Sequence, residues 1–158
     1  MTPAITLYAV LVFLHVLAIV IWVGGMFVMH TAVRPSAVQL LEPPQRLPLM
    51  TAILGRFFKW VAWAVLVTLA TGVAMIALAG GIRPLHGSVY WMFGVGVVMM
   101  LIYGHIRFAP FPRLQRAVAA KDWPGAARNL DLIRVMVGVN LAFGVVTIMI
   151  ATLGRAFF

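Results

Sequence analysis

The stretch LYAVLVFLHVLAIVIWVGGMFVMH, residues 7–30, contains no Asp, Glu, Lys or Arg in 24 consecutive residues. At ~1.5 Å per residue it is long enough to cross the ~30 Å hydrocarbon layer of a bilayer as a helix. No Lys or Arg precedes it, whereas a cleaved signal peptide begins with a basic region. We therefore expect a transmembrane helix that remains in the protein.

His15 lies near the middle of this predicted helix. An ionisable side chain at that depth is costly in a membrane, so it is a functional candidate by default. Tyr8, Trp22 and Met29 recur with His15 at seven-residue intervals, which places all four on one face of the helix. We expect this face to contact other helices rather than lipid.

The composition of the whole chain also indicates a membrane protein. Of its 158 residues, 64% are hydrophobic and 9% are charged, with a mean hydropathy of +1.07, whereas soluble domains carry about 25% charged residues. The chain contains no Cys, which excludes thiolate zinc sites and iron–sulfur clusters and leaves His and Met as ligands for a metal or haem. Glu42, Asp122 and Asp131 all lie in or near predicted loops, so paired carboxylates for hydrolytic chemistry are missing.

Four apolar segments are long enough to span a membrane, at about 4–30, 54–79, 88–108 and 133–154. We predict a single transmembrane domain over 1–158, an all-α integral membrane protein folded as an antiparallel four-helix bundle. The proline-rich segment 31–50 is expected to be a loop with a short interfacial helix. The segment at about 112–132 is basic and partly amphipathic, and Asp122 is placed to cap a helix ahead of Pro124.

The net charge of +9 is concentrated in the two longer predicted loops and their flanks, which hold 10 of the 12 Lys and Arg residues. These ten are Arg34, Arg46, Arg56, Lys59, Arg107, Arg113, Arg116, Lys121, Arg128 and Arg134. Arg83 and Arg155 lie on the opposite side. By the positive-inside rule both loops are cytoplasmic, and both termini are periplasmic in a multi-pass protein of the bacterial inner membrane. The basic charge is thus explained by topology, without nucleic acid as a partner.

Two of the four histidines are predicted to lie at similar depth. Counted at ~1.5 Å per residue, His15 lies ~18 Å and His105 ~26 Å from the outer helix ends, an offset that ordinary helix tilts can absorb. Two histidines on facing helices can hold a haem. We therefore predict haem b with His15 and His105 as iron ligands, and a redox or electron-transfer role with a quinone or redox protein as partner. The predicted pocket residues are Trp22 and Tyr8, with Arg56, Lys59 and Arg107 near the propionates.

Copper binding is an alternative to haem. Met26, Met29 and His30 are spaced i, i+3 and i+4, and thioether and imidazole groups suit Cu(I); His86 is a further candidate ligand. Methionine is equally a common filler of apolar interiors. A second alternative is therefore a structural or assembly subunit whose histidines only pack, and the small-residue stripe of Asn140, Gly144, Thr147 and Ala151 suits close helix contact, including in a homo-oligomer.

Several short segments resemble a known family. They are LHVLAIVIWVGGMF (14–27), GRFFKW with TG further along (55–60 and 71–72), MMLIYGH (99–105) and NLAFGVVTIMIATLGR (140–155). Together they resemble small members of the copper resistance protein D (CopD) group, and the framework is similar to that of the HemJ-type protoporphyrinogen oxidases, four-helix proteins that bind haem b.

The resemblance to the HemJ-type proteins implies specific haem residues. In these proteins a first-helix His precedes a Trp by seven residues and a third-helix His lies near the helix end, which His15, Trp22 and His105 match. The Lys that they carry about three turns before the third-helix His is absent here, where the sequence reads Phe93–Gly94. The resemblance therefore implies a haem-dependent oxidoreductase without implying protoporphyrinogen oxidation.

Overall fold

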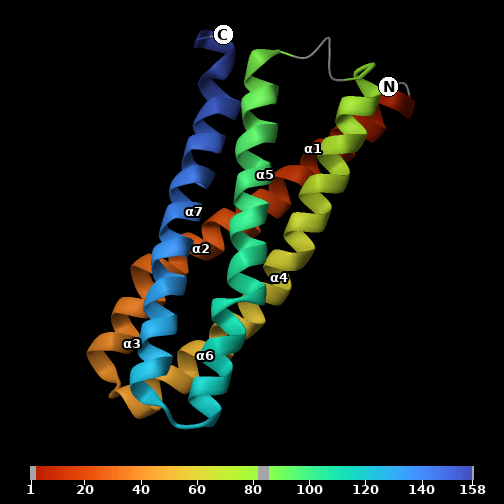
Figure 1. The fold of residues 1–158 in the computed structure, drawn as a ribbon. Helices are drawn as coiled ribbons and strands as arrows, with labels where there is room; N and C mark the ends of the chain where they lie inside the picture. Colours follow the sequence, from red (N-terminus) through yellow and green to blue (C-terminus); the bar gives the residue numbers. More distant parts are fainter. Residues whose placement is uncertain (1–2, 82–85, 158) are drawn as a thin grey trace.

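The computed structural model describes residues 3–81 and 86–157, and these residues form long helices that lie side by side (Figure 1). Four helical segments in this part of the chain are long and apolar enough to cross a membrane: Ile5–Leu40, Pro43–Leu78, Gly87–Ala119 and Trp123–Gly154. The predicted all-α, multi-pass membrane architecture is confirmed for the described residues. Their outward-facing side chains contact the lipid bilayer.

The first membrane segment is helical without a break, but two π turns interrupt its α-helical hydrogen bonding. It comprises α1 (Pro3–Ile19), the π turn η1 (Val20–Gly24), α2 (Gly25–Val28), the π turn η2 (Met29–Val33) and α3 (Arg34–Leu40). A π turn bonds residue i to i+5 and occurs frequently at functional sites. In Figure 1 the whole segment crosses the other helices obliquely.

The second segment, α4 (Pro43–Leu78), begins eleven residues before the predicted span. The prediction of a loop with a short interfacial helix over 31–50 is therefore wrong, because only Leu41 and Glu42 in that range are non-helical and the other residues belong to the two long helical segments. Pro43 and Pro44 occupy the first turn, where an amide N–H has no helical partner to lose. Pro48 lies within the helix near its start. Pro43 and Pro44 therefore begin this helix, and Pro48 does not end it.

The remaining helices are α5 (Gly87–Phe108), α6 (Pro110–Ala119) and α7 (Trp123–Phe157). A tight turn separates α6 from α7, with Lys121 at a φ of 55°. The cap predicted at Asp122 is confirmed, since its Oδ1 accepts a hydrogen bond from the Gly125 N–H at 2.9 Å. The predicted amphipathic segment at 112–132 corresponds to α6 and the first turns of α7.

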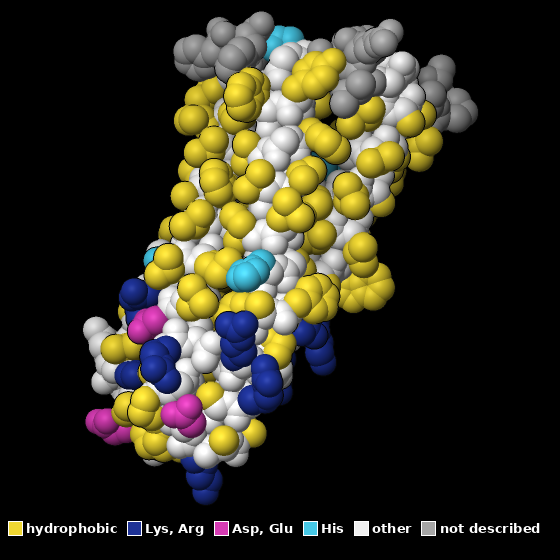
Figure 2. Space-filling view, viewed as in Figure 1, with side chains coloured by type: hydrophobic (Ala, Val, Ile, Leu, Met, Phe, Trp, Pro, Cys, Tyr) yellow, Lys and Arg dark blue, Asp and Glu magenta, His cyan; other side chains and the backbone are white. Residues whose placement is uncertain are grey.

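The two ends of the molecule differ in charge. Figure 1 shows both chain ends at one end, and the α3–α4 and α6–α7 connections at the other. Lys and Arg side chains gather around these connections in Figure 2. We call this end of the molecule the basic end. There Asp131 of α7 forms ion pairs with Arg34 (3.5 Å) and Arg134 (3.7 Å). Arg83 and the side chain of Arg155 lie outside the described part of the chain.

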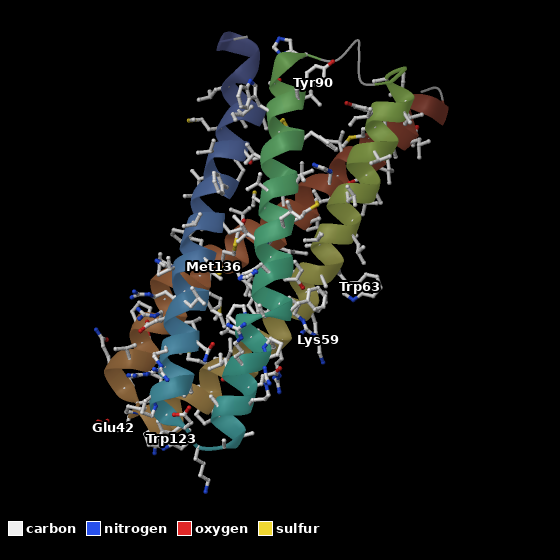
Figure 3. The ribbon with its side chains drawn as sticks, in the orientation of Figure 1. Glu42, Lys59, Trp63, Tyr90, Trp123 and Met136 are labelled. Atoms are coloured by element: carbon white, nitrogen blue, oxygen red, sulfur yellow. The ribbon has the colours of Figure 1, made fainter. Side chains whose placement is uncertain are left out.

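An aromatic core fills the half of the bundle nearer the basic end. The Phe58 ring packs against the rings of Tyr103 and Phe111 at centroid distances of 6.1 and 5.0 Å, and Trp22 meets Tyr103 at 6.4 Å. The Tyr103 hydroxyl donates a hydrogen bond to the Phe58 carbonyl at 2.7 Å. On the outside of α4, Lys59 and Trp63 point away from the bundle (Figure 3). Trp63 is 66% exposed, as expected for a lipid-facing aromatic residue near the interface.

Candidate functional site

A cavity of about 270 Å³ lies between α1, α4, α5 and α7 in the half of the bundle nearer the chain ends. Its position follows from its lining, which includes Tyr8 near the start of α1, Ala79 just after α4 and Val89 near the start of α5. Most of the lining is apolar, and His15 is the one histidine among the described residues that line the cavity. We call this space the His15 cavity.

The hydrogen bonds around His15 indicate which ring nitrogen carries the proton. Nδ1 of His15 lies 2.8 Å from the Thr71 hydroxyl oxygen, and that hydroxyl lies 2.6 Å from the Val67 carbonyl. The single hydroxyl proton is donated to the carbonyl, so the oxygen accepts from the Nδ1–H of His15. In the neutral ring Nε2 then keeps its lone pair, and this tautomer can bind a metal through Nε2.

Four methionines line the same cavity. Met75 comes from α4, and Met92, Met99 and Met100 come from α5. The three on α5 are spaced i, i+7 and i+8, which places them on one helical face. Met99 is only 2% exposed, and the Thr147 hydroxyl of α7 lies 3.9 Å from its sulfur. The His15 cavity thus combines one imidazole with four methionine side chains, whose thioether sulfurs are soft ligands.

One polar atom of the cavity wall has no partner. Thr68 is 8% exposed, and its hydroxyl oxygen makes no hydrogen bond within the described residues. Such an unsatisfied buried group costs about 1–3 kcal/mol. Thr68 lines the His15 cavity, but this oxygen is itself buried in the cavity wall.

The structure separates the two predicted haem ligands. His15, Tyr8 and Trp22 line the cavity, whereas His105 is exposed and lies outside the lining. Trp22 lies at the level of Tyr103, and His15 precedes Trp22 by two helical turns, or ~10 Å of rise. The offset between His15 and His105 is therefore not absorbed by tilt. The geometry gives no support to a haem held between them.

The cations predicted to meet haem propionates lie outside the cavity as well. Arg56 and Lys59 are exposed on α4. The Arg107 guanidinium packs over the rings of Phe108 and Phe111 at 5.9 and 5.7 Å. These contacts belong to the basic end of the bundle, where such side chains flank the membrane.

The residues predicted for copper are divided among three places. Met26 is 2% exposed, and the Asn140 side-chain amide lies 3.7 Å from its sulfur. Met29 and His30 line a second, smaller cavity of about 30 Å³ together with Met50, which we call the Met29 cavity. His86 lies at the opposite end as the N-cap of α5, with its Nδ1 3.1 Å from the Ser88 hydroxyl.

The site methionines on α5 were only partly visible in the sequence. The spacing of Met92, Met99 and Met100 indicates a common face, but their convergence with His15 depends on how α1 and α5 pack. Within residues 3–81 and 86–157, no three His, Cys, Asp or Glu side chains gather into a metal site.

A family model for copper resistance protein D (CopD) matches residues 51–153, which is more than half of the chain. The chain belongs to the CopD family. The predicted resemblance to this family is thereby confirmed. Comparison with curated proteins and with solved structures gives no match.

The part that matches the CopD family includes all four cavity methionines and Thr68, Thr71 and Thr147. It begins after α1, so His15, Trp22 and Met26 lie outside it. A copper resistance family fits the thioether lining of the cavity. The resemblance to HemJ-type proteins stays a prediction.

Proposed function

We propose that this CopD family member binds monovalent copper in the His15 cavity and serves in copper resistance or homeostasis. The observation that carries the proposal is the convergence of His15 with four methionines around one cavity. Imidazole and thioether groups are ligands that Cu(I) prefers, whereas Mg²⁺ and Ca²⁺ require oxygen ligands. Family membership supports the same reading.

The hydrogen-bonded chain behind His15 supports binding as well. In the neutral tautomer that donates from Nδ1 to the Thr71 hydroxyl, Nε2 is left to bind the ion. Partners of this kind typically contribute 10–100-fold to metal affinity. His15 is therefore the proposed anchoring ligand, and Met92, Met99 and Met100 are proposed to complete the coordination with Met75.

For the membrane topology, we propose an antiparallel bundle in a bacterial inner membrane with its basic end in the cytoplasm. The positive-inside rule supports this orientation, because Lys and Arg gather at that end (Figure 2). The chain ends and the His15 cavity then lie toward the periplasm. Copper would reach the cavity from that side.

The test is a Cu(I) competition titration of the detergent-purified protein against a chromophoric Cu(I) chelator. We expect the affinity to fall about tenfold or more in His15→Ala, in Met92→Leu/Met99→Leu and in Thr71→Val, which keeps the imidazole but removes its partner. Met149→Leu is the matched control, since Met149 is 50% exposed on α7, away from the cavity. Unchanged Cu(I) affinity in all three variants would contradict the proposed copper site.

The same sample distinguishes copper from haem. Its optical spectrum is recorded oxidised and dithionite-reduced, with metal analysis. Bound copper without a Soret band is expected. A Soret band that is lost in both His15→Ala and His105→Ala would instead establish the haem prediction and overturn the copper proposal.

A further inference from the structure

The Met29 cavity has an apolar floor and a basic rim. Among the residues that line it, Ile133 is 1% and Met50 3% exposed. The rim is reached from outside, since His30 is exposed and the side chains of Arg34 and Arg134 are 28% and 40% exposed. The cavity therefore opens at the surface of the bundle, between the first membrane segment, α4 and α7.

The two guanidinium groups at the rim come from different helices. Arg34 begins α3 and Arg134 belongs to α7. Asp131 lies 3.5 Å from the first and 3.7 Å from the second, and the longer distance is beyond hydrogen-bond range. Asp131 is 63% exposed and is not part of the cavity lining, in which no Asp or Glu occurs among the described residues. Two positive charges thus share one external carboxylate, and the rim is net positive.

The donors at this rim are largely unused. Each guanidinium has five N–H donors, and the hydrogen bond from Arg34 to Asp131 is the one that either group makes within residues 3–81 and 86–157. His30 adds a ring N–H whatever its tautomer. Its ring lies against α7 at Gly138, where a Cβ would be 3.3 Å from the Cε1 atom of His30. Gly138 follows Arg134 by one turn on the same face of α7.

These groups suit an oxyanion rather than a metal ion. Met29 and Met50 offer sulfur at the floor, but two guanidinium groups at the rim repel a cation. Guanidinium groups bind phosphate oxygens through charge-assisted hydrogen bonds. The volume of about 30 Å³ is close to the share of one water molecule in the liquid. It can admit a phosphate oxygen, while the rest of a ligand must lie along the outside of the bundle.

The surface beside the cavity indicates what that remainder is. Phe27 and Val28 lie within one turn of His30, and Val139 follows Gly138 directly; all three are exposed and apolar. Apolar side chains so placed in a membrane segment contact acyl chains. Basic pockets between membrane helices on the cytoplasmic side bind the headgroups of anionic lipids. The basic rim and its apolar surroundings therefore match the two parts of one phospholipid molecule.

We propose that the Met29 cavity binds the phosphate of an anionic phospholipid from the leaflet at the basic end. Arg34, Arg134 and His30 donate to the phosphate oxygens, and the acyl chains lie along the exposed apolar side chains beside the cavity. The lipid joins the first membrane segment to α7 beside the π turn Met29–Val33, where regular helical hydrogen bonding is interrupted. The inference uses the proposed membrane orientation and is independent of the copper site.

The test is a titration of the detergent-purified protein with phosphatidylglycerol or with phosphatidylcholine of the same acyl chains, followed by thermal unfolding and by native mass spectrometry. Phosphatidylglycerol should raise Tm and remain bound, because a ligand of the folded state stabilises it. Arg34→Gln and Arg134→Gln should each weaken its binding about tenfold, the loss expected for a charge-assisted hydrogen bond. Arg113→Gln is the control, since it removes the same charge from an exposed residue at the same end, outside the cavity.

Asp131→Asn provides a test of opposite sign. This variant keeps both arginines and removes the carboxylate that competes for them. Binding of phosphatidylglycerol should become tighter, whereas the loss of a merely structural ion pair would leave it unchanged or weaken it. The prediction holds even if an arginine variant fails to fold.

The outcomes distinguish the lipid from other ligands. Equal effects of the two lipids, or equal losses in Arg34→Gln, Arg134→Gln and Arg113→Gln, would overturn the proposal. An equal rise in Tm with inorganic phosphate would assign the cavity to a free anion and overturn the lipid. Cu(I) affinity at the His15 cavity should not change in these variants, so failure of the lipid site leaves the copper proposal standing, and failure of the copper proposal leaves the lipid site standing.

Discussion

The two halves of this bundle are packed differently. Near the basic end, Phe58, Tyr103 and Phe111 fill the space between the helices, and Phe58 is 2% exposed. Toward the chain ends, the same helices enclose a cavity of about 270 Å³ lined by methionines. The same four membrane segments therefore form a rigid half and an open half.

The difference shows how a small membrane protein can hold a site open. Aromatic rings have few rotamers and fix the helix positions, whereas methionine is flexible and its sulfur is polarisable. The aromatic core joins α4 to α5 near the basic end through Phe58 and Tyr103, and the cavity lies between the same helices nearer the chain ends. The thioethers can then adapt to an ion without moving the backbone.

The largest expected effect is in the rigid half. Phe58→Ala removes the ring at the centre of the aromatic core and should lower the free energy of unfolding by about 3–5 kcal/mol. Thermal unfolding in detergent measures the change. Trp63→Ala removes a larger ring that is 66% exposed and should have a much smaller effect. Equal losses in the two variants would contradict the distinction between a packed core and a lipid-facing surface.

A smaller effect is expected where the two halves meet. Gly144→Ala places a Cβ 2.8 Å from Val23, and overpacking of this kind costs about 1–3 kcal/mol. Gly104→Ala on α5 is the control, because its Cβ would meet nothing within 4 Å. Unfolding measurements on both should show a loss only at Gly144. A stable Gly144→Ala protein would show that the helices there can separate without cost.

The sequence predicts the membrane helices well because apolar length is a local property. It does not predict the helical state of the segment 31–50, since prolines break a helix in its interior but are favourable in its first turn. Pro43 and Pro44 lie in the first turn of α4. Which of these roles a proline takes depends on where the helix begins, and the sequence alone leaves that open.

The candidate site is harder to predict because it depends on helix packing. Depth counting treats the helices as parallel rods and places His15 near His105. The first membrane segment instead runs obliquely and contains two π turns (Figure 1). Trp22 consequently meets Tyr103, and His15 lies beside Thr71 and the α5 methionines. His15 was recognisable as functional from its depth, but its neighbours were not.

The smallest expected free-energy change tests the open half directly. Gly96 lines the His15 cavity, and a Cβ there would meet nothing within 4 Å. Gly96→Leu should therefore fill the cavity without displacing a helix and weaken Cu(I) binding about tenfold, or ~1.4 kcal/mol. Gly94→Leu is matched to it, since Gly94 is also open on α5 but lies outside the cavity lining.

The two leucine variants distinguish the effect of lost cavity volume from the effect of a changed helix propensity in α5. Both replace a glycine within α5, so both gain the same helix propensity and should unfold at or above the temperature of the unaltered protein. Chelator competition should then show weaker Cu(I) binding in Gly96→Leu alone. If both variants bind as tightly as the unaltered protein, the open space beside His15 is not where the ion resides. If both lose binding equally, α5 contributes through its flexibility, and the methionine lining would no longer explain why one half of the bundle is left open.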